Sequence, residues 1–151
     1  MKCLKSFDKF GVITYLTDGD KTYIECIVES AIPFQPGVYL VYGIKAGNVY
    51  DLLYFGKAGV TQNKGKPLVN RHQIPSRLLA TTQVPKGHKN YVEGKRIDIS
   101  RADLWPWLAK KQKLHGLKIY WYITWPQHSP ITVERKIRKE LKGVIPEWSK
   151  R

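Results

Sequence analysis

Two short apolar runs bounded by glycines constrain the fold more than any other feature of the sequence. The first is Gly37 to Gly43 (GVYLVYG) and the second is Val49 to Gly56 (VYDLLYFG). Runs this short, and this rich in β-branched and aromatic residues, are typical of strands rather than helices. The segment between them, Ala46-Gly47-Asn48, is turn-like. The sequence therefore predicts a hairpin of two central strands.

Further strands are expected on both sides of this hairpin. Gly11 to Leu16 and Thr22 to Val28 flank an Asp-Gly turn, which predicts an N-terminal β-hairpin over about residues 10–30. The segment Leu117 to Trp125 (LKIYWYITW) is the strongest strand candidate of the chain.

Three segments have the signals of helices. They are Arg77 to about Thr82, Leu104 to about Lys113, and a last helix beginning at Pro130, with Ser76, Asp103 and Ser129 as expected caps. In the last helix, four apolar residues fall on one face: Val133, Ile137, Leu141 and Val144. Together these elements predict an α+β fold, a central antiparallel β-sheet flanked by helices.

The length and composition fit one domain. The 151 residues are 42% hydrophobic, enough for a single core, so we expect one domain over 1–151, with a basic insertion at about 83–116. No apolar run approaches the roughly 20 residues of a membrane helix, and we expect neither a signal peptide nor contact with a membrane. The two cysteines, Cys3 and Cys26, are expected to be reduced thiols of a cytoplasmic protein and are too few for a zinc site.

Positive charge is concentrated in the middle of the chain. The net charge is +14, and residues 57–118 hold 14 basic and 3 acidic side chains, whereas residues 1–56 hold 5 basic and 6 acidic. Such an excess predicts a positive face that binds a polyanion, with double-stranded DNA as the expected partner. The candidate DNA-binding residues lie in two basic segments: Lys64, Lys66, Arg71, Lys86, Lys89, Lys95 and Arg96.

Four short motifs stand in a particular order along the chain. Gly37-Val38-Tyr39 and Tyr54-Phe55-Gly56 lie on the two predicted central strands, Ser76-Arg77-Leu78 begins a helix, and Glu134 lies in the last helix. In this order they resemble the signatures of the GIY-YIG nuclease family, over roughly residues 36–149. Lys57, directly after the second signature, is similar to restriction-type members. The chain departs from the family at Thr81, where a histidine is common, and at Ser149, near the usual asparagine.

The resemblance implies a metal-dependent endonuclease that hydrolyses DNA phosphodiester bonds, with site-specific restriction as the first role. It implies Tyr39 as general base, supported by Tyr54 and Lys57, and Arg77 as the phosphate clamp. Glu134 would be the ligand of Mg²⁺ or of another divalent cation such as Mn²⁺. These roles agree with chemistry, since a planar guanidinium pairs with phosphate oxygens and Mg²⁺ needs few protein ligands.

Other interpretations stay open at this stage. Each site residue has an ordinary structural explanation, and the same basic face would serve a DNA-binding module without catalysis. An RNA-directed nuclease and a repair or mobile-element nuclease are further alternatives. Cutting both strands of a palindromic duplex would suit a homodimer. Glu93-Gly94-Lys95 matches a short element of another nuclease class, but that class needs an upstream acidic residue, and none lies between Asp51 and Glu93.

Overall fold

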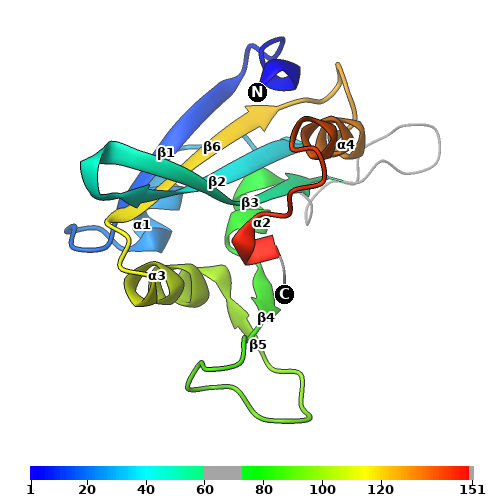
Figure 1. The fold of residues 1–151 in the computed structure, drawn as a ribbon. Coiled ribbons are helices and arrows are strands. Elements are labelled where there is room, and N and C mark those ends of the chain that lie inside the picture. The colour runs from blue at the N-terminus through cyan, green and yellow to red at the C-terminus, as the bar shows by residue number, and fades with distance from the viewer. Residues whose placement is uncertain (60–72, 150–151) are drawn as a thin grey trace.

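The computed structural model describes residues 1–59 and 73–149. It is an α+β fold whose main sheet has four antiparallel strands in the order β1-β6-β2-β3, with a separate two-stranded sheet of β4 and β5 (Figure 1). The strands are β1 (Phe10–Leu16), β2 (Gly37–Lys45), β3 (Val49–Ala58), β4 (Thr81–Gln83), β5 (Asp98–Ser100) and β6 (Gly116–Ile123). The predicted fold class is confirmed.

Four α-helices and three short 3-10 segments complete the described residues. The helices are α1 (Tyr23–Glu29), α2 (Ile74–Leu78), α3 (Arg101–Lys111) and α4 (Pro130–Glu140), and the 3-10 segments are η1 (Lys2–Leu4), η2 (Ala46–Asn48) and η3 (Glu147–Ser149). Within the described ranges, no helix has both the length and the apolar character to cross a membrane.

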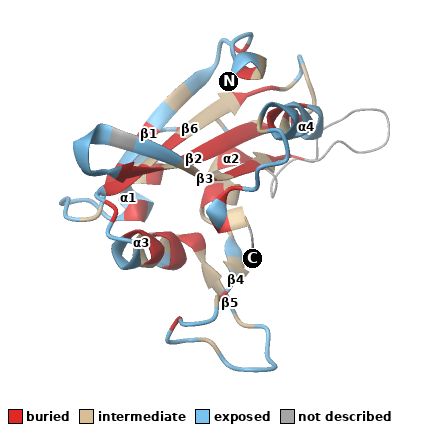
Figure 2. Ribbon diagram, viewed as in Figure 1, coloured by how far each residue is buried: buried red, intermediate tan, exposed pale blue. Residues whose placement is uncertain are grey.

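Each face of the main sheet has its own apolar core. On one face, which we call the lower face, the sheet residues pack with side chains of α1, α2, α3 and η3. On the opposite, upper face, Val38, Leu40 and Phe55 pack with residues of η1 and α4. Figure 2 shows β2 buried along almost its whole length, as expected for a strand that is covered on both faces.

The predicted central hairpin is confirmed, and it contains a β-bulge. Strands β2 and β3 pair from Gly37 to Lys45, and the register shifts between Val41 and Tyr42, which face Tyr54 and Leu52. Leu53 is therefore the extra residue of β3. As a result, Leu53 and Tyr54 both pack on the lower face, although neighbouring residues of a regular strand point to opposite faces.

The predicted N-terminal hairpin over about 10–30 is wrong in its second half. Residues 10–16 form β1, but β1 pairs with β6, and Tyr23–Glu29 is helix α1. The physical reason is a capping box: the Thr22 side chain accepts a hydrogen bond from the Glu25 N–H, and the Glu25 carboxylate accepts one from the Thr22 N–H. These two hydrogen bonds favour a helix despite the β-branched residues of the segment.

The predicted helix boundaries also need correction. Helix α2 begins at Ile74 with Pro75 in its first turn, so Ser76 lies inside it rather than at its cap. Helix α3 is capped by Ser100, not by Asp103, which places Pro106 inside the helix. The expected start of α4 is confirmed, because the Ser129 side chain accepts a hydrogen bond from the Thr132 N–H.

The predicted apolar face of the last helix is correct only in part. Val133 and Ile137 are buried and Leu141 packs at the edge of their cluster. Val144 is 69% exposed, because α4 ends at Glu140 and Gly143 has a positive φ of 81° that turns the chain away.

The expected basic insertion forms a projecting arm and a helix. We call residues 81–100 the basic arm: it consists of β4, β5 and the segment that joins them, and it extends away from the main sheet (Figure 1). Most of the joining segment is exposed (Figure 2). The arm is fixed at its base, because the Arg101 N–H donates to the Ala80 carbonyl at 2.9 Å.

Gly37 is required by the close approach of β2 and β6. A Cβ atom at this position would collide with the carbonyl oxygen of Tyr122.

We expect Gly37→Ala to lower the free energy of unfolding by about 3 kcal/mol, measured by urea denaturation. Gly47→Asn is the matched control, since Gly47 has a φ of 75° with open space around it, and asparagine tolerates that conformation. Equal stability of the two variants would contradict the packing described here.

Candidate active site

Two tyrosines from neighbouring strands lie against each other under the sheet. Tyr39 of β2 and Tyr54 of β3 both pack into the lower core, with ring centroids 6.0 Å apart and an interplanar angle of 24°. The bulge at Leu53 is what brings Tyr54 to this face. Tyr39 is fully buried, whereas Tyr54 is only half-buried. The two phenols thus differ in their access to solvent.

Gly56 provides the space for the Tyr39 phenol. A Cβ atom on Gly56 would lie 2.6 Å from the Tyr39 hydroxyl oxygen and 3.0 Å from the Tyr54 ring. Gly56 is the cross-strand partner of Tyr39. The glycine and the two tyrosines are therefore one steric unit, which explains why these residue types occur together.

Arg101 holds both phenols. Its guanidinium donates to the Tyr39 hydroxyl at 2.7 Å, to the Tyr54 hydroxyl at 3.1 Å and to the Arg77 carbonyl at 2.6 Å. The rings of Tyr39, Tyr54 and Trp105 surround it, with the guanidinium carbon 5.1 to 6.0 Å from their centroids. Three hydrogen bonds and three aromatic rings thus hold the guanidinium in place.

The position of Arg101 is electrostatically unusual. Only 5% of the residue is exposed, and within the described residues no carboxylate forms an ion pair with it. It is also the first residue of α3, at the helix end where the macrodipole disfavours a cation. Burial works to lower the pKa of Arg101, but the neighbouring phenols outweigh it and leave that pKa raised. The site therefore holds a fixed positive charge that an entering anion would neutralise.

A cavity of about 560 Å³ opens beside these residues. Its walls come from β3, β4, α3, α4 and the C-terminal segment, and the residues with polar groups among its lining are Tyr54, Thr82, Arg101, Trp105, Glu134, Arg138, Trp148 and Ser149. The C-terminal wall is attached to α3 by the Trp148 indole N–H, which donates to the Gln112 side chain at 3.2 Å. The volume falls within the range of ligand-binding clefts.

Glu134 and Ser149 are the residues of the cavity lining that could hold a hydrated cation. Glu134 lies on the cavity wall with 15% of its side chain exposed, and its one ion pair within the described residues is a loose 3.7 Å contact with Arg138. The Ser149 hydroxyl is buried in the same lining without a hydrogen-bond partner. No group of three His, Cys, Asp or Glu side chains that could hold a metal occurs in residues 1–59 and 73–149. The residues fit a hydrated cation with one carboxylate ligand.

The structure separates the other expected site residues from the cavity. Lys57 pairs with Val38, so its side chain leaves β3 on the upper face, opposite the tyrosines. Arg77 lies close enough to Tyr39 to lower its pKa, but it contributes its carbonyl rather than its side chain to Arg101. Neither Lys57 nor Arg77 lines the cavity.

The expected DNA-binding residues fall into two groups. Lys64, Lys66 and Arg71 lie outside the described residues. Lys86, Lys89, Lys95 and Arg96 are all exposed on the basic arm, and Arg96 forms an ion pair with Asp98 at 3.1 Å.

Arg101 is the functional candidate that sequence reasoning missed. The available signal was its place directly after Ser100, which is a good helix cap. An arginine at the first position of a helix opposes the macrodipole, so it calls for an explanation from tertiary structure.

No protein-family model matches this sequence, and no curated protein or solved structure matches it.

Burial makes Tyr39 a weak acid. Desolvation raises the pKa of Tyr39 to about 12, although the Arg101 guanidinium works to lower it. Because the unfolded chain loses this proton near pH 10, Tyr39 contributes stability below pH 10 that is lost as the pH rises towards 12. Each such phenol steepens the fall by about 1.4 kcal/mol per pH unit at most.

We expect Tyr39→Phe to flatten this alkaline loss of stability, measured as the urea-unfolding free energy between pH 9 and pH 12. Tyr50→Phe is the control, because Tyr50 is 42% exposed rather than buried. If both variants keep the slope of the unchanged protein, the description of Tyr39 as a buried phenol is wrong.

Proposed function

We propose that this chain is a Mg²⁺-dependent endonuclease that hydrolyses phosphodiester bonds of DNA. The observation that carries the proposal is the convergence of Tyr54, Arg101 and Glu134 on one cavity. A guanidinium for the phosphate, a hydroxyl for the water and a carboxylate for a cation are the groups that phosphodiester hydrolysis needs. The proposal agrees with the resemblance to the GIY-YIG nucleases in the reaction and in Glu134. It changes the roles of the two tyrosines and of Arg77, and it gives none to Lys57.

Arg101 replaces Arg77 as the proposed phosphate clamp. Its three assigned hydrogen bonds leave further N–H groups of the guanidinium for a phosphate in the cavity, since arginine has five donors. Charge that develops on the phosphate oxygens in the transition state would meet a cation that is already fixed in place. Arg77 then acts through its carbonyl, as a support for Arg101.

Tyr54 replaces Tyr39 as the residue that handles the attacking water. It reaches the cavity, whereas Tyr39 is fully buried with a pKa raised to about 12. The water oxygen bonds to phosphorus while the bond from phosphorus to the leaving sugar oxygen breaks. Tyr54 relays a proton, accepting one from the water as it passes its own to solvent. The leaving oxygen takes its proton from solvent, and Tyr39 positions Arg101.

Glu134 is the residue that would hold the divalent cation. Bound there, Mg²⁺ would supply Lewis-acid stabilisation of the leaving oxygen. Ser149 would give its hydroxyl to the water shell of the cation, which accounts for a buried oxygen without a partner.

The proposed substrate is double-stranded DNA, with restriction of foreign DNA as the first biological role. The exposed Lys86, Lys89 and Lys95 of the basic arm suit phosphate contacts that position a duplex. A homodimer would cut both strands of a palindromic site. We place the activity in the cytoplasm, where Cys3 and Cys26 stay reduced.

A second candidate function is DNA binding without catalysis. The observation in its favour is that Glu134, which lies near Arg138, is the single carboxylate among the described residues that line the cavity. The two functions differ in whether Glu134 is needed for a chemical step.

Loss of the carboxylate charge tests the nuclease directly. We expect Glu134→Gln to lower the rate of plasmid nicking at least about a hundredfold in Mg²⁺, and we expect EDTA to abolish nicking by the unchanged protein. The measurement is the appearance of nicked and linear DNA on agarose gels.

Glu93→Gln is the matched control, because Glu93 lies on the exposed arm and belongs to the rival Glu-x-Lys element. It should cleave at the rate of the unchanged protein. Tight, salt-sensitive binding with no cleavage by any variant would support the binding module instead.

Lysines of the arm should determine the salt dependence of duplex binding. We expect the double variant Lys86→Ala/Lys89→Ala to reduce the slope of log K against log salt by about 2, measured in EDTA by fluorescence anisotropy. In the control, Lys21→Ala/Lys45→Ala, both lysines already pair with acidic side chains. An unchanged slope in the arm variant would exclude the arm from the DNA interface.

A further inference from the structure

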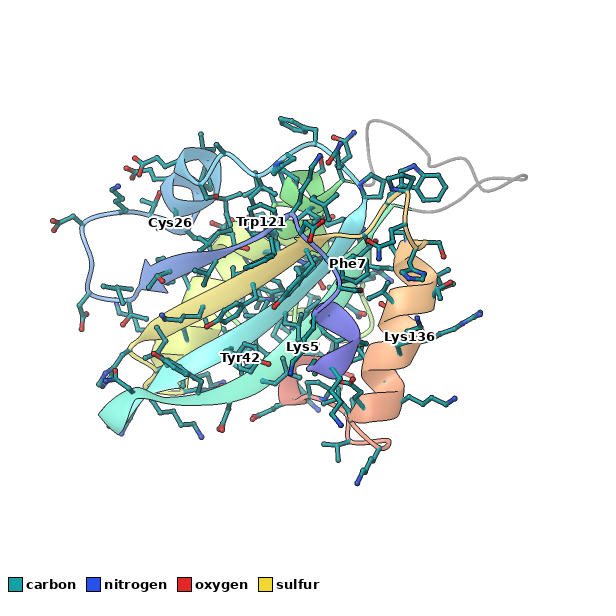
Figure 3. The ribbon with its side chains drawn as sticks, turned by 90° about the horizontal axis from the view of Figure 1, so that it is seen from above. Lys5, Phe7, Cys26, Tyr42, Trp121 and Lys136 are labelled. Atoms are coloured by element: carbon teal, nitrogen blue, oxygen red, sulfur yellow. The ribbon has the colours of Figure 1, made fainter. Side chains whose placement is uncertain are left out.

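The upper face of the main sheet is only partly covered. In Figure 3, η1 and α4 lie over one part of this face, and the labelled Tyr42 lies on the part beyond η1, near Lys5. The exposed part presents an aromatic cluster around one lysine, which we call the open tyrosine face: Phe10, Tyr42, Tyr50, Tyr120, Tyr122 and Lys118. None of these residues belongs to the proposed catalytic site.

Strand register brings these aromatic side chains together. Phe10 faces Tyr122 across β1 and β6, and their rings stack with centroids 5.9 Å apart at 25°. Tyr42 and Tyr120 make an edge-to-face contact at 5.6 Å. Phe10 is 60% exposed and Tyr50 is 42% exposed, so much of this aromatic area faces solvent.

A hollow of about 190 Å³ lies between the tyrosines. Four tyrosines line it together with three apolar residues of the N-terminal segment and β2: Tyr42, Tyr50, Tyr120, Tyr122, Met1, Leu4 and Leu40. The tyrosine hydroxyls that form hydrogen bonds within the described residues all belong to other parts of the molecule. The hydroxyls around the hollow therefore have no partner within the described residues and are open to water or to a ligand. Flat rings with polar edges suit a ligand that is itself flat, aromatic and polar at its edge.

The charge of this face selects a polyanion. The Lys118 Nζ lies 5.5 Å from the centroid of the Tyr50 ring, inside the cluster. Lys5 lies near Tyr42 on the side of η1 (Figure 3), and the Asp51 carboxylate, next to Tyr50 in the chain, is paired with Lys45. A second copy of the chain docking on this face would bring the lysines of both copies together, which costs energy.

We propose that the open tyrosine face binds single-stranded DNA by stacking unpaired bases on its aromatic rings. Bases stack on exposed aromatic side chains whatever their sequence, and interspersed lysines hold the phosphates between them. The face lies on the side of the sheet opposite the rings of Tyr39 and Tyr54. It would hold an unpaired strand away from the cleaved bond, which goes beyond the duplex cleavage proposed above.

The test uses the full chain in EDTA, with a fluorescent oligothymidine of about 20 nucleotides as the probe. We expect Phe10→Ala/Tyr50→Ala to raise the Kd at least about tenfold. Both residues are exposed, so the fold should be retained. Phe34→Ala is the matched control, because Phe34 is a 71% exposed aromatic residue outside the cluster, and its Kd should not change.

Two further measurements separate stacking from charge. An oligonucleotide of the same length with abasic sites keeps its phosphates and should bind much more weakly than oligothymidine. Lys118→Gln should reduce the slope of log K against log salt by about 0.7.

Three results would overturn the proposal. They are an unchanged Kd in Phe10→Ala/Tyr50→Ala, equal affinity for the abasic strand, and a dimer in analytical ultracentrifugation that this double variant converts to monomer. The last result would make the face a contact between copies. Because these assays contain no metal and use no residue of the cavity, they stay informative if Glu134→Gln leaves cleavage unchanged.

Discussion

A buried guanidinium is the interaction on which the rest of the site depends. Arg101 has no carboxylate partner among the described residues, and it keeps its charge through hydrogen bonds to two phenols and one carbonyl, inside a ring of aromatic faces. Desolvating a cation is costly, so each contact must be in place at once. This explains the close local packing. A side chain at Gly56 would occupy the space of the Tyr39 phenol, and the Tyr39 hydroxyl accepts a hydrogen bond from Arg101.

The same charge connects elements that are distant in sequence. Helix α3 supplies the guanidinium, β2 and β3 supply the phenols, α2 supplies a carbonyl, and α4 and the C-terminal segment close the cavity around them. Helices on both faces of the sheet make this possible: α4 packs on the upper face and α3 on the lower face. The cavity lies where side chains of both helices meet those of β3. A site built across a sheet edge can take substrate from the side without any opening of the core.

Sequence reasoning predicted the elements with strong local signals. The central hairpin, the strand expected over Leu117 to Trp125 and the Ser129 cap could all be predicted, because periodicity and capping are local properties. The structure has that strand as Gly116–Ile123. The N-terminal hairpin failed, since the Thr22–Glu25 capping box outweighed the β-branched composition of the segment. Tyr54 and Glu134 were expected in the site and both reach the cavity. Arg101 was not expected, because its contact with Tyr39 joins residues 62 positions apart, and such a contact produces no periodic pattern in the sequence. Lys57 was expected from its position directly after the second signature, and strand alternation puts its side chain on the face opposite Tyr54.

The single extra residue at Leu53 determines how β3 would respond to an insertion or deletion. Tyr50 and Tyr54 are four positions apart, so in a regular strand both rings would lie on the same face of the sheet. Because of the bulge, Tyr50 lies on the upper face and Tyr54 on the lower face. An in-frame deletion of one codon there would restore regular alternation. Either Tyr54 would then leave the cavity or Tyr50 would leave the upper face, while the composition and net charge of the chain would hardly change. In this strand, residue count therefore matters more than residue identity.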